Sequence, residues 1–200
     1  MSLELINTLG TVTTVVIVAA AAIAALVQLR HLRAGNQINA MLSIGEKFQG
    51  QGFQNALELV NTKLAAALED PSFRNYAIAM GRGDPSVPQV DTKHVDVRRA
   101  AILVGNVYEE LGILVKNGIV DKTLFLDRFC GVIISAWHRL EAFTAHGRES
   151  SGNPGIWENF ELITVLSEDW LRNNPSNYPR AIRRLQPHNP WPVPPLPETA

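Results

Sequence analysis

The chain begins with an apolar stretch that carries no formal charge between Glu4 and Arg30. As an α-helix this stretch would measure roughly 37 Å at about 1.5 Å per residue, more than the hydrocarbon core of a bilayer at about 30 Å. The pattern therefore predicts a transmembrane helix over residues 11–29, after a short external N-terminus over residues 1–10. The lipid bilayer is the first expected partner.

A cleaved signal peptide is the main alternative for this segment. Signal peptides begin with positive charge and have a shorter apolar region, whereas residues 1–10 contain no Lys or Arg. Basic residues follow the segment, at Arg30, Arg33 and Lys47. The positive-inside rule then predicts a single-pass protein of the cell (inner) membrane, with the N-terminus outside and the main domain in the cytoplasm.

Small residues inside the predicted span recur at four-residue spacing. Such faces let helix backbones approach closely, which is how membrane helices associate. A second interpretation is that alanine is merely tolerated beside lipid. On the first interpretation, other membrane protein subunits pack against Gly10, Thr14, Ala20, Ala21, Ala24 and Ala25.

Helical periodicity continues past the span. Apolar residues keep near-helical spacing over residues 30–49, which predicts a juxtamembrane stalk with Gly35 as a candidate bend. Gly50-Gln51-Gly52 interrupts the pattern, and residues 53–172 are expected to form a helical cytoplasmic domain.

The domain begins with two shorter helices. The first is expected over residues 53–68, and Asp70-Pro71 is typical of an N-cap followed by proline at N1, opening a helix that runs to Met80. Residues 81–90 are dense in glycine and proline and predict a loop.

Two long helices and a last helix follow. Asp91 or Thr92 caps the first, Asn117-Gly118 ends it, and Asp121 caps the second. The second is apolar on nearly every side and should therefore be central and buried. Asn153-Pro154 opens the last helix, and no segment shows sustained strand alternation. The fold class is all-α, with four to six helices in a bundle or orthogonal packing. The expected buried positions of the first long helix are Val97, Ala101, Val104, Tyr108, Leu111 and Val115.

Composition narrows the function. A net charge of −1 argues against nucleic acid as a partner. Cys130 is the only cysteine and cannot form an internal disulfide, and the histidines lack the spacing of a zinc site. No phosphate-binding loop or nucleophile elbow is present. The sequence therefore predicts no cofactor, no metal and no enzymatic activity.

A group of polar residues near the expected core is the least ordinary chemical feature. It consists of Asn106, Glu109 and Glu110 on the first long helix, His138 on the second and Glu158 on the last. Three facing helices could bring these side chains together as a carboxylate–imidazole cluster. Surface pairs and structural hydrogen bonds explain them equally simply.

Residues 173–200 form a basic and then proline-rich tail. Arg180, Arg183 and Arg184 could touch anionic lipid or an acidic partner, although a solvated helix end explains them as well. The segment 187–200 should adopt polyproline II, either as a ligand for an aromatic groove or as a solvated tail.

Several stretches carry a resemblance to a known family. They are residues 28–33, Asn36-Gln37, residues 106–118 (Asn-Val-Tyr-Glu-Glu-Leu-Gly-Ile-Leu-Val-Lys-Asn-Gly), Trp137 and residues 154–160. The chain resembles, over about residues 25–165, a bacterial family of single-span membrane proteins catalogued as a domain of unknown function. The resemblance implies a membrane-anchored helical cytoplasmic domain and supplies no catalytic residues.

The expected function is that of a non-catalytic, membrane-anchored interaction protein. An accessory or scaffolding subunit of a larger membrane complex fits best, and a respiratory or photosynthetic complex is a conceivable host. Partner subunits would contact the N-terminal helix and the C-terminal tail. The alternative is a small membrane-tethered hydrolase or ligand sensor that uses Glu109, His138 and Glu158. A cleaved, exported domain is the third hypothesis.

Overall fold

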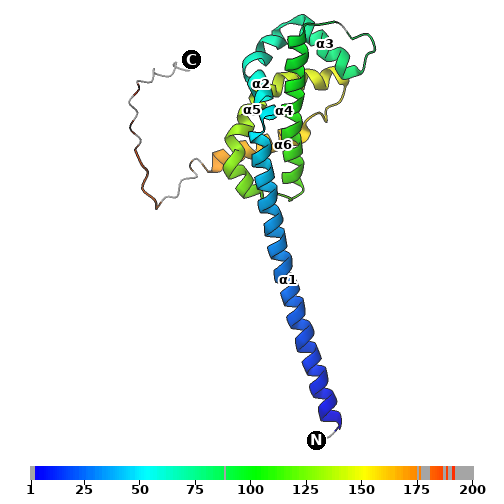
Figure 1. Ribbon diagram of the computed structural model, residues 1–200, viewed down its shortest axis with the longest axis vertical. Helices are drawn as coiled ribbons and strands as arrows, with labels where there is room; N and C mark the ends of the chain where they lie inside the picture. Colours follow the sequence, from blue (N-terminus) through cyan, green and yellow to red (C-terminus); the bar gives the residue numbers. More distant parts are fainter. Residues whose placement is uncertain are drawn as a thin grey trace.

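The described part of the chain folds into six helices and contains no strand (Figure 1). The structure is a computed structural model that describes residues 3–87, 89–174, 176, 181–186, 188 and 191. The all-α fold class is confirmed for these residues. Arg180 and nearly all of segment 187–200 lie outside them, so the predictions for the proline-rich tail stay untested.

Helix α1 (Leu3–Gln49) is one continuous helix of 47 residues that projects from the rest of the molecule (Figure 1). Residues 7–36 are all exposed, and the first buried side chain is Ile44. Gly35 lies inside the uninterrupted helix, so the candidate bend does not form. The predicted span and stalk are thus a single rod whose last turns pack on the domain.

Helices α2 (Gln51–Glu69) and α3 (Pro71–Arg82) meet at Asp70. The Asp70 carboxylate accepts a hydrogen bond from the backbone N–H of Ser72 at 2.8 Å, which satisfies a free donor at the start of α3. Gly83 ends α3 in the left-handed conformation, with φ of 66°. The predicted cap and proline start are confirmed, and α3 runs two residues beyond the expected Met80.

Helices α4 (Thr92–Lys116) and α5 (Lys122–Ser151) form the centre of the domain. Asp91 caps α4 by accepting from the N–H of Lys93, and Asp121 caps α5 by accepting from the N–H of Leu124. Asn117 is the C-cap of α4, as predicted. All six positions expected to be buried on α4 are buried.

The expectation that α5 is buried on every side is wrong. Phe125, Ile133 and Leu140 are fully buried, but Leu124 is 59% and Val132 is 51% exposed. Leu124 lies in an open groove of about 860 Å³ between α5 and α1, which Ile38 and Leu42 also line. Both faces of α5 carry apolar side chains, but only one face is packed closely enough to bury them.

Helix α6 (Glu158–Asn173) begins later than Asn153-Pro154, the expected start. Residues 154–157 form turns, and Trp157 adopts the left-handed conformation with φ of 54°. The Arg148 Nε donates to the carbonyl of Ile156 at 2.9 Å and so fixes this connection to α5. The helix cannot extend back through Trp157 because its φ is not helical.

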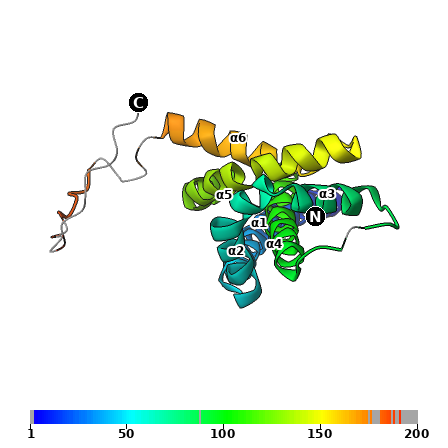
Figure 2. The ribbon, with the colours of Figure 1, turned by 90° about the horizontal axis from the view of Figure 1, so that it is seen from above.

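One hydrophobic core joins all the helices, including the end of α1. The rings of Tyr108 and Phe160 are stacked, with centroids 4.7 Å apart, and Phe48 of α1 lies 5.6 Å from Tyr108. In Figure 2, α4 is seen nearly end-on and α6 lengthwise, so the two helices cross. The stalk is therefore attached to the domain by aromatic contacts at the centre of the core.

Candidate functional site

Glu109 on α4 caps the start of α6. Its Oε2 accepts hydrogen bonds from the backbone N–H groups of Asn159 at 3.0 Å and Phe160 at 2.9 Å. Its Oε1 accepts from the Asn159 side-chain amide at 2.6 Å. Trp157, the N-cap residue of α6, makes no side-chain capping bond. The Glu109 carboxylate of α4 therefore accepts from these free N–H donors, and it places a negative charge at the positive end of the helix dipole.

Asn106 lies one turn before Glu109 and holds Trp157. The indole Nε1 of Trp157 donates to the Asn106 Oδ1 at 3.0 Å. The ring of Trp157 fills a notch at Gly105, where an added Cβ would lie 2.1 Å from the ring. These contacts hold Trp157 in a backbone conformation that costs of order 1–3 kcal/mol for a residue other than glycine.

Gly112 gives the α6 backbone its closest approach to α4. A Cβ at Gly112 would lie 2.1 Å from the carbonyl oxygen of Asn159. Gly105, Glu109 and Gly112 follow the helical spacing of four and three residues and thus share one face of α4. This junction was missed from the sequence, where the signal was two glycines inside a strong helical pattern.

Glu110 points elsewhere, toward the stalk. It forms a hydrogen-bonded ion pair with Lys47 at the end of α1. The side chains are 42% and 57% exposed for Lys47 and Glu110, so water and salt screen the attraction. Lys47 is one of the basic residues that follow the predicted span, and in the structure its charge is paired with that of Glu110.

The predicted carboxylate–imidazole cluster does not form. His138 and Glu158 are both exposed, and no hydrogen bond or ion pair joins any two of Asn106, Glu109, Glu110, His138 and Glu158. Within the described residues, no group of three or more His, Cys, Asp or Glu could hold a metal ion. The polar residues of α4 bind the start of α6 and the end of α1, which is a structural arrangement.

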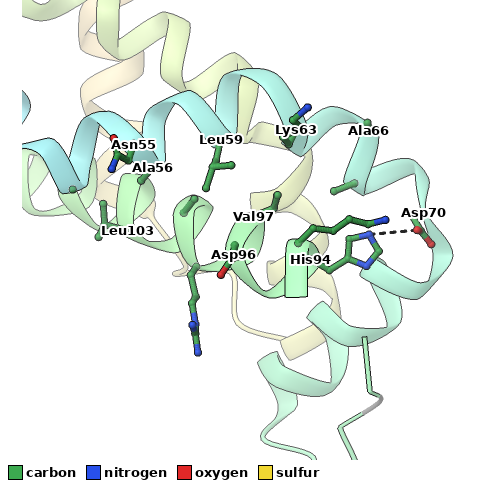
Figure 3. A pocket seen from close by; sticks show the side chains of 15 residues that line it. Asn55, Ala56, Leu59, Lys63, Ala66, Asp70, His94, Asp96, Val97 and Leu103 are labelled. Atoms are coloured by element: carbon green, nitrogen blue, oxygen red, sulfur yellow. Dashed lines mark ion pairs between the residues drawn. The ribbon is translucent and has the colours of Figure 1, made fainter. Parts of the chain in front are cut away.

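An open apolar groove of about 790 Å³ lies between α2 and α4 (Figure 3). Leu59 points from α2 toward α4, and Val97 and Leu103 contribute from α4. Alanines on both helices line the groove, and charged side chains of both signs stand around it. They are Lys63, Asp70, Lys93, Asp96 and Arg99.

A histidine–carboxylate pair closes one end of this groove (Figure 3). The Nε2 of His94 lies 3.4 Å from Asp70 Oδ2, while its Nδ1 is buried without a hydrogen-bond partner. The Phe73 ring packs edge-on against the imidazole at 5.5 Å. The described residues that line the groove include no Ser, Thr or Cys. The Ser72 hydroxyl lies beside the pair, but it donates to Asp70 Oδ1 at 2.8 Å and not to the imidazole base that nucleophilic catalysis needs.

The pKa of Asp70 is held below its ordinary value. The hydrogen bonds from the Ser72 hydroxyl and the Ser72 N–H are the main causes, and His94 adds a smaller attraction. A carboxyl group with a lowered pKa in the folded state contributes stability above its ordinary pKa of about 3.9, and this is lost as the pH falls through the lowered value. Asp70 thus joins the starts of α3 and α4 at neutral pH.

These features define a class of protein: a compact helical domain carried on a long apolar helix. The chain matches the family described as Domain of unknown function (DUF4760) over residues 15–165, and it belongs to that family. The matched region begins inside α1 and ends within α6, so it includes part of the apolar helix with the domain. Neither a curated protein nor a solved structure matches the chain.

Proposed function

We propose that this chain is a non-catalytic, membrane-anchored interaction protein that acts as an accessory or scaffolding subunit of a larger membrane assembly. Helix α1 carries the proposal. Over Asn7–Gln49, this helix is long and apolar enough to cross a membrane, and Val15, Val16, Ile17 and Val18 are each 60–62% exposed. An apolar surface of this extent rarely stays in contact with water, and a bilayer or another protein would cover it.

The residues that flank the apolar stretch favour an orientation. Arg30 and Arg33 follow it, are exposed and form no ion pair within the described residues. Lys47 also follows the stretch and forms an exposed ion pair with Glu110. Two free arginines after the span still support an external N-terminus and a cytoplasmic domain.

The small-residue face of α1 supports a protein partner inside the bilayer. Gly10, Thr14, Ala20, Ala21, Ala24 and Ala25 are all exposed. The Thr14 hydroxyl donates to the carbonyl of Gly10 at 2.9 Å, and Thr11 donates in the same way to Asn7. These threonines therefore bring no unsatisfied polar group into a lipid environment or a helix interface.

Membrane extraction tests the anchor. We expect the full chain to stay in the membrane pellet after alkaline carbonate treatment. The double variant Val16→Arg/Val18→Arg should appear largely in the supernatant, because each central arginine costs about 2.5–3.5 kcal/mol of insertion free energy. Val132→Arg is the matched control, since Val132 is an exposed apolar residue on α5. Release of the unmodified chain by carbonate would refute the anchor.

Co-purification in mild detergent tests the partner. We expect other membrane proteins to accompany the full chain and to be lost from Ala21→Ile, which fills the small-residue face. Ala19→Ile adds the same volume on the opposite side of the helix and should keep them. A monomeric chain without accompanying proteins would count against the role of an accessory subunit. Sequencing the purified chain from its N-terminus would test the alternative of a cleaved, exported domain, since a cleaved chain would lack Met1.

A further inference from the structure

A second, smaller cavity lies on the other side of α4 from the groove. It has a volume of about 220 Å³ and sits between α3, α4, α5 and the turn before α6. Ile102, Phe143 and Trp157 form apolar walls, while Arg98, Asn106 and Ser150 contribute polar groups. The described residues that line this cavity include no Asp or Glu.

Arg98 is a half-buried cation without a counter-ion. Its guanidinium carbon lies 5.9 Å from the centre of the Tyr76 ring, which is a cation–π contact. Its Nε is buried and has no hydrogen-bond partner, and no ion pair involves Arg98 within the described residues. Burial lowers the pKa of the Arg98 guanidinium below its usual value. A partly desolvated charge without an anion is costly.

The neighbouring polar groups add donors or are already engaged. The Asn106 Oδ1 accepts from the Trp157 indole, which fixes the amide orientation and leaves the Asn106 NH₂ group as a donor. The Thr144 hydroxyl donates to the carbonyl of Leu140 at 2.8 Å. The Ser150 hydroxyl donates to the carbonyl of Gly147 at 3.2 Å. His146 also lines the cavity, and its Nε2 lies 3.3 Å from the carbonyl of Arg74. The Arg98 guanidinium and the Asn106 NH₂ group therefore remain as donors toward the cavity, and Arg98 brings a positive charge without a carboxylate beside it.

We infer that this cavity, formed by Arg98 and Asn106 against the Trp157 ring, binds a small monocarboxylate with a compact apolar body. The planar guanidinium of Arg98 matches a carboxylate through paired hydrogen bonds. The walls of Ile102, Phe143 and Trp157 suit an apolar body rather than a polyol or a nucleotide. The volume would hold about seven water molecules at about 30 Å³ each, which is close to the size of benzoate or isovalerate.

The bound carboxylate would also act on the junction of α4 with α6. Trp157 and Asn106 line the cavity and are the same residues that hold the start of α6 beside Gly105. Ligand contacts to them stabilise the strained backbone of Trp157. This ligand site is independent of the proposed membrane role and adds to it. With a bound ligand, the domain would act as a carboxylate sensor.

Calorimetric titration of the full chain in detergent micelles tests the inference. Benzoate and isovalerate are the probes, benzamide is the neutral analogue of benzoate, and inorganic phosphate is the anion without an apolar body. We expect both carboxylates to bind and benzamide and phosphate not to bind. Arg98→Met should weaken benzoate binding by about tenfold or more, because the guanidinium supplies charge-assisted hydrogen bonds. Arg99→Met should leave it unchanged, since Arg99 lines the groove on the other side of α4.

Asn106→Asp provides a second variant if Arg98→Met does not fold. It retains an acceptor for the Trp157 indole but places a negative charge in the cavity, so benzoate binding should weaken and the fold should persist. Absence of benzoate and isovalerate binding up to roughly 20 mM would overturn the inference. Unchanged binding in a folded Arg98 or Asn106 variant would overturn it, as would binding of phosphate in preference to benzoate.

Discussion

Helices α1 and α4 are both long and rich in apolar residues, and their surroundings are opposite. Helix α4 has 25 residues and buries apolar side chains such as Ala101 and Val104 completely. Helix α1 has 47 residues, and Ile44 near its end is the first buried one. The polar residues on α4 bind other helices, whereas the first turns of α1 satisfy their threonine hydroxyls within the helix itself. Helix α4 is therefore part of the packed hydrophobic core, whereas most of α1 presents its apolar side chains outward.

Removing a large side chain should give the largest difference in unfolding free energy between the packed core around α4 and the exposed helix α1. Phe160 of α6 is fully buried and stacks on Tyr108 of α4, so Phe160→Ala should lower the free energy of unfolding by about 3–5 kcal/mol. Leu26→Ala, at a position 62% exposed on α1, should leave domain unfolding unchanged. Thermal denaturation in detergent, followed by circular dichroism, measures both. Equal losses of unfolding free energy in the two variants would mean that Leu26 of α1 packs into the domain.

A single added methyl group should act in opposite directions on the two helices. Gly112→Ala on α4 should destabilise the domain by about 1–3 kcal/mol, because the Cβ would collide with the α6 backbone. Gly35→Ala on α1 meets nothing within 4 Å and should raise local helix stability by up to about 1 kcal/mol. Urea denaturation compares the first variant with the parent, and amide hydrogen exchange around residue 35 checks the second. A neutral Gly112→Ala would contradict the close approach of α6.

Two adjacent glutamates on α4 allow the most specific comparison. Glu109→Gln should cost about 1.5–3 kcal/mol, because the α6 donors lose their charged acceptor. Glu110→Gln should cost less than about 1 kcal/mol, since its ion pair with Lys47 is exposed. Denaturation curves of both variants at low and high salt give the difference, and only Glu110→Gln should lose its effect at high salt. The reverse order would show that the stalk contact dominates.

Local patterns predicted the helix ends well. Asp70 and Asp121 were expected as N-caps, and each accepts a backbone N–H bond in the structure. Of the two candidate caps of α4, Asp91 and Thr92, it is Asp91 that accepts such a bond. A cap depends on residues within one turn of the chain, so its chemistry is visible in the sequence. The same holds for the apolar stripe of α4, which needs only the helical period.

Contacts between distant segments were predicted poorly. Glu109 was expected in a cluster with His138 and Glu158, but it caps α6 while the other two side chains face solvent. The late start of α6 at Glu158 depends on the notch at Gly105 that receives the Trp157 ring. These outcomes depend on how α4 and α6 rotate and cross, which the spacing of residues along one helix does not specify.

The sequence by itself determined the apolar length of α1, the all-α class and the caps, because each depends on composition or on contacts within a few residues. The tertiary structure alone decided that α5 has one exposed face, that His94 meets Asp70, and that Arg98 lies in a cavity without a counter-ion. The physical reason is that burial and pairing of side chains depend on neighbours from other helices, and packing brings those neighbours together from distant parts of the chain.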